Sequence, residues 1–588
     1  MAEPFGAKGA STQQEISAAQ VNHLPIVAHF ARRLGLVQIV NRLVPTQMEV
    51  EPGLIVLGLV LDTLSGRSPL YHLQTAFEDC DRALLFGRDL PAEYFGDDNV
   101  GRMLDRLYEV GTQRIFSALS VAALEGFPVS TQHAHFDTTS VTLYGDYLSG
   151  QGEEAPFKIA HGYSKDKRPD LKQFVLSLLC VDSNVPILGK LEDGNASDKT
   201  INHRLLSEVC GHMHKHGVGE DAFIYIADSA MVTEANLAQA GERTRFITRL
   251  PATYNEHERV ILSAIEADDW TELGPIAQTP PTNNRPGACY RVHEGSVTLY
   301  GKDYRAVVVH SSAHDQRRLK RLERELSASR SEIEEIARAA AKKTFFCRAD
   351  AEAAAAEMRA YSSAYHQMNV RVEERPRYGR GRPKKNVPKT PVAIEYVLGI
   401  EILEKHEEVA KRRQLAGCFV LLSNVPDEDK GGYSPEQILR TYKEQNGIEK
   451  NFGFLKDDRI VNALFLKRPE RIEALGLILL ISLLIWRLIE LVMRTELQAQ
   501  QATVPGWDNK PTARPTAYMM TWKFKGVLIL CFGAERRLAK PLTDTQLAFL
   551  HAYRSRQAAL PSTRATDRMP KKIEAPMPNG CGMYALSC

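Results

Sequence analysis

Cysteine is scarce in this sequence, and its spacing argues against a disulfide-bonded domain and against a zinc finger. The nine cysteines are scattered over 588 residues, and none forms a Cys-x-x-Cys pair. Their odd number and wide spacing are typical of reduced thiols rather than of a disulfide framework, and they do not match a zinc finger. The pattern therefore favours a protein of the cytosol.

Signals for export or for a membrane span are also missing. The N-terminal segment contains no basic run followed by an apolar run, so we predict no signal peptide. The most apolar stretch, residues 474–486, is shorter than the ~20 residues that a spanning helix needs, and charged residues flank it on both sides. We expect this stretch to be a core helix, and we expect no membrane partner.

The net charge gives no argument for or against a polyanionic partner. Lys and Arg total 74, and Asp and Glu total 72, so any affinity for nucleic acid must come from local patches. At ~150 residues per domain, a chain of 588 residues is too long for one hydrophobic core, and we expect several domains.

Changes in hydrophobic periodicity divide the sequence into segments. Residues 1–130 have the three- and four-residue apolar spacing of helices and predict a helical N-terminal domain, a candidate for binding terminal-repeat DNA. Residues 131–250 alternate short β-branched runs with turn signals. They predict three consecutive strands, a helix near 199–215 and a fourth, buried strand that ends at Asp228. Such a mixture is typical of an α/β fold with a mixed sheet.

The predicted sheet is interrupted before it is complete. Residues 251–414 contain β-like runs and a long amphipathic helix, interpreted as one arm of a helical hairpin, and together they indicate a large α+β insertion. Strand and helix patterns return in residues 415–495, where Ser434 has the features of a helix N-cap. Residues 496–588 form a C-terminal tail with little signal.

Two aspartates lie where strands supply rigidly held carboxylates. Asp137 is inside the first predicted strand, and Asp228 ends the fourth. Cleavage of a phosphodiester with two divalent metal ions requires carboxylates that converge on ions about 3.5–4 Å apart. If the first and fourth strands are neighbours, these two side chains can meet. Taken singly, each aspartate can equally cap a strand and begin a turn.

A third acidic residue belongs to the helix predicted between residues 434 and 457. At about 100° per residue, four polar residues share one face of this helix: Tyr442, Gln445, Glu449 and Lys456. The adjoining apolar face consists of Ile448, Phe452 and Leu455. The helix can therefore bury its apolar side on a sheet and present Glu449 at the edge of that contact. An ordinary amphipathic helix explains the apolar stripe but not the choice of polar residues.

The polar set resembles the signature of the DDE transposases of insertion-sequence family 4, in the branch with a long helical N-terminal region. That signature is Tyr, two residues, Arg, three residues, Glu, six residues, Lys. Here the spacing is kept from Tyr442 through Glu449 to Lys456, and Gln445 stands in the Arg place.

Other stretches of the chain resemble the same family in their order and placement. They are HGYSKDKRPDLKQF at 161–174, GNASD at 194–198 and the acid-small-small triplet that begins at Asp228. The resemblance runs from about Val21 to Arg494 and covers nearly all of the chain except its tail.

The resemblance implies an RNase H-like fold that is split by an insertion before the last catalytic acid. Asp137, Asp228 and Glu449 are then the catalytic residues and the ligands of two Mg²⁺ ions, for which Mn²⁺ can substitute. Water first attacks the phosphodiester at the end of the element, and the freed 3′-OH then attacks target DNA. Tyr442, Gln445 and Lys456 are expected to contact the DNA, since Lys offers a point charge and Tyr a donor and a stacking face.

The partners that the resemblance implies are nucleic acid and a second copy of the chain. Double-stranded DNA is expected both as the terminal inverted repeats of the element and as the target, bound by a homodimer. The expected location is cytoplasmic and nucleoid-associated.

A basic strip near the end of the insertion is a second candidate for DNA contact. The segment 378–386 contains an Arg-Gly-Arg-Pro core and resembles an AT-hook, which lays arginines into a narrow A·T minor groove. Its basic residues are Arg380, Arg382, Lys384 and Lys385. The alternative is a basic, flexible linker that binds phosphate without reading sequence.

Two other functions remain open from the sequence. One is a catalytically inactive, transposase-derived protein that binds DNA without cutting it, although acids at all three places favour the enzyme. The other is an RNase H-like nuclease without strand transfer, which should not need the long insertion or a domain that binds the element's ends.

Overall fold

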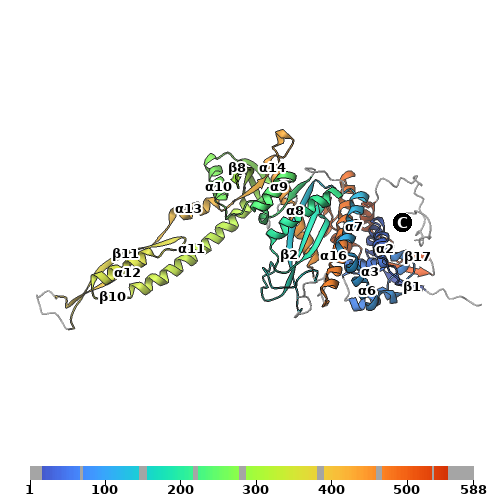
Figure 1. Ribbon diagram of the computed structural model, residues 1–588, viewed down its shortest axis with the longest axis horizontal. Coiled ribbons are helices and arrows are strands. Elements are labelled where there is room, and N and C mark those ends of the chain that lie inside the picture. The colour runs from blue at the N-terminus through green and yellow to red at the C-terminus, as the bar shows by residue number, and fades with distance from the viewer. Residues whose placement is uncertain are drawn as a thin grey trace, which may run out of the picture. The chain divides into compact units, whose positions relative to one another are not determined.

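The computed structural model describes residues 16–66, 70–144, 147, 155–215, 223–276, 287–380, 390–457, 466–532 and 535–553. The chain forms two compact units (Figure 1). The first consists of residues 1–246 and 443–588, and the second of residues 247–442. The second unit contains the whole of segment 251–414, in which the sequence indicates an insertion, and extends beyond it on both sides.

The N-terminal region of the first unit is helical, as predicted. Its helices are α1 (Leu24–Arg33), α2 (Leu36–Leu43), α3 (Pro52–Ser65), α4 (Leu73–Glu78), α5 (Arg82–Phe86), α6 (Asp97–Val110) and α7 (Thr112–Gly126). The apolar residues of these helices are buried, as their spacing predicts. Helix α3 is buried along almost its whole length, and α6 buries Val100, Met103, Leu104 and Leu107 on one side.

A single long helix forms the core of the first unit. Helix α16 (Pro469–Ala499) contains the apolar stretch of residues 474–486 and packs against α3, α6, α7 and β4 (Val185–Glu192) (Figure 1). It is long and apolar enough to pass a length test for a membrane span, but 94% of its most apolar window is buried inside the structure. Its neighbours on both sides are protein, as the sequence predicts for a core helix.

The sheet of the first unit has the strand order β4-β3-β2-β5. Strands β2 (His133–Thr142), β3 (Gln173–Val181) and β4 form the predicted antiparallel meander. Helix α8 (Asp198–Lys215) follows, and β5 (Ile224–Ile226) then pairs with β2 in parallel. The first and fourth strands are therefore neighbours, which was the assumption behind pairing Asp137 with Asp228.

The described part of the C-terminal tail, up to Tyr553, belongs to the first unit. Strand β1 (Ile16–Gln20) joins β16 (Leu528–Phe532) and β17 (Glu535–Leu538) in a small sheet made from both ends of the chain. The tail also contains β14 (Val504–Pro505), β15 (Pro511–Thr512), α17 (Ala517–Lys523) and α18 (Asp544–His551), and α9 (Glu234–Arg243) completes the first unit. Buried Ile529 and Phe549 show that much of the tail packs as part of this unit.

The second unit contains four sheet strands and a long arm. The strands have the order β13-β9-β8-β7, and they are β7 (Thr271–Pro275), β8 (Cys289–Leu299), β9 (Lys302–Ser311) and β13 (Cys418–Ser423). The chain enters this unit through β6 (Arg245–Arg249), whose last residues pair with β13. Helices α10 (Asn255–Ala267), α13 (His406–Leu415) and α14 (Pro435–Lys443) complete it.

The arm consists of α11 (Ser312–Ala341), α12 (Arg348–Ala360), β10 (Thr344–Phe345), β11 (His366–Arg377) and β12 (Ala393–Glu404), side by side in Figure 1. The predicted helical hairpin is present, but its second helix ends at Ala360. From His366 the chain is a strand, and its buried side chains Met368 and Val370 pack with Ile333 of α11.

The helix predicted over residues 434–457 is wrong as a single element. Ser434 caps its start as expected, because its hydroxyl oxygen accepts from Gln437 N at 3.3 Å. The chain then breaks at Gln445 and restarts as α15 (Asn446–Leu455). Asn and Gly are weak helix formers, and Gly447 packs so closely on Asn184 that a Cβ there would lie 1.6 Å from its Oδ1. Tyr442 therefore belongs to α14 and not to the face of the helix that carries Glu449.

Candidate functional site

Asp137 and Asp228 lie opposite each other at the edge of the first unit's sheet. The parallel pairing of β2 with β5 ends with His135 beside Ile226. Two residues further along the chain lie Asp137, inside β2, and Asp228, just after β5, whose backbone is still extended at φ −73° and ψ −178°. Each carboxylate accepts a local backbone N–H, Asp137 from Thr138 at 2.7 Å and Asp228 from Ala230 at 3.0 Å.

Lys165 supplies a positive charge at this edge. Its Nζ lies 3.9 Å from Asp137 Oδ1 and 3.4 Å from Asp198 Oδ2. The same ammonium group donates to the backbone oxygen and to Oγ1 of Thr138, at 2.7 and 2.8 Å. Thr138 Oγ1 donates in turn to Asp198 Oδ1 at 2.6 Å. The carboxylates of Asp137, Asp198 and Asp228 are therefore gathered about one ammonium group, close enough for charge interactions among them.

A glycine contact brings the segments that carry Lys165 and Asp198 to the strand ends. A Cβ on Gly194 would lie 1.9 Å from the backbone oxygen of Gln173, and a Cβ on Gly162 would lie 2.1 Å from the backbone oxygen of Gly194. Gln173 Nε2 closes the contact by donating to Gly194 O at 2.8 Å. The stretches 161–174 and 194–198, singled out in the sequence, thus meet through backbone that only glycine permits.

Burial and mutual repulsion make these carboxylates costly to ionise. The pKa of Asp137 is raised from 3.8 to about 6, mainly by burial and also by the carboxylates of Asp228 and Asp198, while Lys165 and the Thr138 N–H act to lower it. Burial also raises the pKa of Asp228, and so does Asp198. Acidic groups that are buried together with raised pKa values are typical of sites that bind a cation.

Helix α15 lies beside β2 and contacts this region at both of its ends. At its N-cap, Gln445 Nε2 donates to the backbone oxygen of Phe136, the residue before Asp137, at 3.4 Å. At its C-cap, Lys456 Nζ donates to Asp166 Oδ1, next to Lys165, at 2.8 Å. Glu449 lies on α15 between these two contacts. Its side chain is exposed and makes no hydrogen bond or ion pair with the described part of the chain.

A buried polar network fixes α15 from its other side. Asn451 is fully buried, and its Nδ2 donates to Asn184 O at 3.0 Å and to Cys180 Sγ at 3.1 Å. Its Oδ1 accepts from Arg487 Nε at 2.6 Å. Arg487 is itself paired with Glu490 inside α16, at 2.6 Å. The apolar face predicted for the helix is buried as expected, through Ile448, Phe452 and Leu455.

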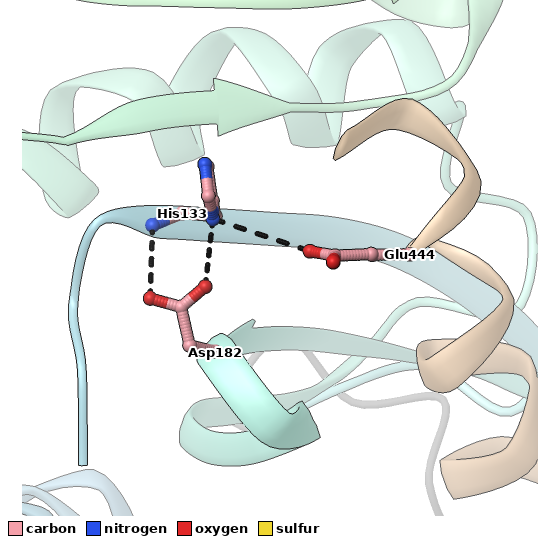
Figure 2. A group of neighbouring side chains, drawn as sticks. All are labelled: His133, Asp182 and Glu444. Atoms are coloured by element: carbon pink, nitrogen blue, oxygen red, sulfur yellow. Dashed lines mark hydrogen bonds and ion pairs between the residues drawn. The ribbon is translucent and has the colours of Figure 1, made fainter. Parts of the chain in front are cut away.

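A second group of possible metal ligands lies at the other end of β2. Among the described residues, His133, Asp182 and Glu444 are the one set of three whose ligand atoms all lie within 4.8 Å of one another. Figure 2 shows His133 between the two carboxylates, with Nδ1 2.7 Å from Asp182 Oδ1 and 4.0 Å from Glu444 Oε2. Asp182 lies on the turn η3 (Asp182–Asn184), and Glu444 immediately precedes Gln445.

The hydrogen bonds of this second group favour a structural role. Asp182 Oδ2 accepts from Ser130 Oγ, from Gln132 N at 3.0 Å and from His133 N at 3.4 Å. His133 Nδ1 is the donor to Oδ1, so a metal ion there would have to replace that proton. Burial raises the pKa of Glu444, whereas His133 and Arg514 lower it. We interpret the group as a clamp between the start of β2 and the start of α15.

The residues predicted from the sequence are placed as follows. The pairing of β2 with β5 brings Asp137 and Asp228 together. Helix α15 carries Glu449 between its caps Gln445 and Lys456, which contact Phe136 and Asp166. Asp137, Asp228 and Glu449 do not all have ligand atoms within 4.8 Å of one another, as judged over the described residues. This spacing fits an exposed Glu449 side chain and the repulsion among like charges.

The residues expected to hold DNA outside α15 belong to the second unit. Tyr442 is half-buried on α14, and Arg380 is exposed in the loop after β11. Arg382, Lys384 and Lys385 lie outside the described residues.

Lys165 and Asp198 were not singled out from the sequence as site residues. Both lie inside the two stretches that resemble the transposase family, but one sequence does not show which of several polar residues there point to the strand ends. His133, Asp182 and Glu444 gave no signal, because they are separated in sequence and follow no ligand spacing.

Comparison with known proteins finds a family match in the N-terminal part of the chain. Residues 16–121 match the family model of a domain of unknown function, DUF4277. This match spans β1, helices α1 to α6 and most of α7. A search of curated proteins finds no match.

Proposed function

We propose that this protein is a DDE-type DNA transposase that cuts and rejoins DNA at the ends of an insertion sequence. The observation that carries the proposal is the juxtaposition of Asp137 and Asp228 on neighbouring parallel strands, with α15 contacting the backbone next to Asp137. Strands from one part of the chain and a helix more than 200 residues later converge on this point, in the order that the family resemblance implies.

The residues present fit a site for divalent cations that prefer oxygen ligands. The carboxylates of Asp137, Asp228 and Asp198 offer only oxygen donors, which suit Mg²⁺ and Mn²⁺. One ammonium group, that of Lys165, faces three carboxylates at this edge. We propose that Asp137, Asp228 and Glu449 hold two such ions, with Mg²⁺ as the natural metal. When bound, the ions would supply Lewis acidity to the phosphodiester.

The chain's own residues position the helix that carries Glu449. Gln445 holds the start of α15 on the backbone of β2, and Lys456 holds its end near Lys165. We propose that the Glu449 carboxylate, which α15 carries between these two contacts, completes the site with the two aspartates. Lys456 is also a point charge suited to a DNA phosphate once it leaves Asp166.

We assign the DNA-binding functions of such an enzyme to other regions of the chain. We propose that the N-terminal helical region that matches DUF4277 binds the terminal inverted repeats, and that the second unit contacts DNA through Arg380 and the basic residues after it. Target DNA and a second copy of the chain are the remaining proposed partners, with the nucleoid as the proposed location. The RNase H-like topology is part of this proposal, while the mixed α/β sheet itself is observed.

The experiment uses the full chain and a duplex that contains the inverted repeats flanking its gene, labelled at each 5′ end. Incubation in Mg²⁺ should produce cuts at the repeat ends and, with a supercoiled plasmid, joined products. Cutting without joining supports an RNase H-like nuclease instead. Repeat-specific binding with neither product supports the inactive, DNA-binding descendant. A chain that neither binds nor cuts the repeats contradicts the proposal.

A further inference from the structure

The tail of the chain exposes a cluster of aromatic side chains. Trp507, Tyr518 and Trp522 are 43%, 40% and 57% exposed. Their rings lie together, with centroids 6.0 Å apart for Trp507 and Tyr518 and 6.5 Å apart for Trp507 and Trp522. In contrast, Trp486 of α16 is 6% exposed. Large aromatic rings are normally buried, and a contiguous exposed group of them marks a binding surface.

Two rigid elements hold this aromatic cluster. Tyr518 and Trp522 are four residues apart on α17 and therefore share a face, while Ala517 and Met520 of the same helix are buried. The first turn of α17 is fixed to the core, because Ala517 N donates to Glu490 Oε1 at 3.0 Å. The aromatic cluster is thus preorganised, which lowers the entropic cost of binding a ligand.

Trp507 is held at the tip of the hairpin formed by β14 and β15. Gly506 N donates to Lys510 O at 2.8 Å, and Lys510 N donates to Trp507 O at 3.0 Å. Asn509 in this tip accepts from Lys523 Nζ of α17 at 3.0 Å. The hairpin and the helix are therefore tied together at the point where their rings meet.

Basic residues accompany the rings in this segment of the chain. Between residues 505 and 525 there are four basic residues and a single acid, Asp508, and the basic residues are Lys510, Arg514, Lys523 and Lys525. Lys525 Nζ lies 5.4 Å from the centre of the Trp522 ring. Arg514 is near enough to Glu444 to lower the pKa of that carboxyl, so the patch begins close to the start of α15.

We propose that Trp507, Tyr518 and Trp522 form a stacking platform for the bases of single-stranded nucleic acid, with the four basic side chains holding the phosphates. Aromatic rings accept any unpaired base by stacking, and flanking cations follow the backbone. Duplex bases are stacked on one another and cannot reach the rings, so the occupant is an unpaired strand. The net positive charge favours a polyanion over a protein or a neutral lipid surface. The inference goes beyond the proposed cleavage chemistry and does not depend on it.

The test is equilibrium binding of fluorescein-labelled oligonucleotides to the full chain, followed by anisotropy. The two probes are an oligothymidylate of about 12 nucleotides, within the usual site size, and an abasic strand of equal length and charge. The protein carries Asp137→Asn and the buffer contains EDTA, so cleavage has no part in the result. The platform predicts tighter binding of oligothymidylate than of the abasic strand.

Ring removal should abolish that difference. Trp507→Ala and Trp522→Ala should each weaken oligothymidylate binding by about 5- to 150-fold and leave the abasic strand nearly unaffected, while Trp522→Phe should retain most of the affinity. Phe346→Ala, which removes an 80% exposed ring in the second unit, is the matched control and should change nothing. All four substitutions are at exposed positions, and an unchanged melting temperature verifies folding.

Two results overturn the inference. Equal affinity for the two probes would show an electrostatic surface without stacking. Unchanged oligothymidylate affinity in the double variant Trp507→Ala/Trp522→Ala would show that the rings serve another occupant, such as a protein. Neither result affects the end-cutting assay, and failure of end cutting leaves the stacking result intact.

Discussion

Asp137, inside β2, and Asp228, just after β5, each lie two residues beyond the last backbone pair of these parallel strands, His135 with Ile226. Parallel strands lie about 4.8 Å apart, so this register alone brings two acids that are 91 residues apart in the sequence into one charged site. Burial and repulsion raise the pKa of both. Because this arrangement disfavours ionisation of both carboxylates, it is best explained by a bound cation that balances their negative charge.

The first prediction concerns Lys165, whose ammonium group and a divalent cation would both balance the same carboxylates. Lys165→Met should lower the melting temperature in EDTA, because it leaves Asp137 and Asp198 without their counter-charge. Added Mg²⁺ should then raise the melting temperature more in the variant than in the wild type. Thermal unfolding with and without Mg²⁺ measures both effects, and Lys172→Met, a change outside the acidic site, is the control. An equal Mg²⁺ response in both proteins would contradict this assignment of Lys165.

The second prediction concerns Gly194, which lets two loops meet. Gly194→Ala places a Cβ 1.9 Å from the backbone oxygen of Gln173, and the backbone must move. We expect a loss of about 1–3 kcal/mol in the free energy of unfolding and loss of Mg²⁺-dependent activity, because Asp198 is displaced. Gly126→Ala, where nothing lies within 4 Å of the added Cβ, is the control. Urea denaturation of both variants measures the two free energies of unfolding that this prediction compares.

The third prediction concerns the network that fixes α15. Asn451→Ala removes a buried acceptor from Arg487 and two donor contacts, and should lower the free energy of unfolding by about 3 kcal/mol. Asn446→Ala changes an exposed residue of the same helix and should have little effect. If the two variants have the same stability, the network does not hold the helix that carries Glu449.

The fourth prediction concerns pH. His23 is buried, and its Nε2 lies 2.9 Å from Leu64 O; burial lowers its pKa from 6.5 to about 4. Above pH 6.5 the ring is neutral in both the folded and the unfolded chain and contributes nothing to pH dependence. As the pH falls from 6.5 to 4 only the unfolded chain takes up a proton at this residue, so stability decreases, by about 3 kcal/mol in total.

Replacement of His23 by Gln keeps a donor for Leu64 O and removes the titration. Urea denaturation at pH 7 and at pH 4.5 should therefore show a smaller loss of stability in His23→Gln than in the wild type. The same loss in both proteins would mean that other groups carry the acid sensitivity.

The sequence predicted the elements with strong periodicity and missed features that arise from tertiary contact. The meander and the core helix could be predicted because buried strands and helices impose their period on the residues, whereas the pairing of the first strand with the fourth was an assumption. The break at Gln445 was missed because it depends on close packing of Gly447 against Asn184, which no local pattern shows. For the same reason α14 and α15 were taken as one helix, and Tyr442 was placed on the helix of Glu449.

The candidate site was predictable to a similar extent. Asp137 was found inside a predicted strand, Asp228 at the end of another, and Glu449 from the spacing of its helix. Lys165 and Asp198 were hidden among other polar residues of two loops, because a single sequence does not show which side chains a glycine contact will turn inward. The aromatic cluster of the tail was missed because its rings come from a hairpin and a helix that meet only in three dimensions.

The most direct test of the account is cleavage of a terminal-repeat duplex in Mg²⁺ by three conservative variants, Asp137→Asn, Asp228→Asn and Glu449→Gln. Each removes a proposed metal-binding charge at nearly constant shape, so each should abolish cutting while DNA binding, measured by electrophoretic mobility shift, stays close to that of the wild type. Asp170→Asn, a change at an exposed acid paired with Arg168, is the matched control and should cut normally. Cutting at the wild-type rate by any of the three variants would contradict the assignment of that residue, and cutting by all three would contradict the proposed active site.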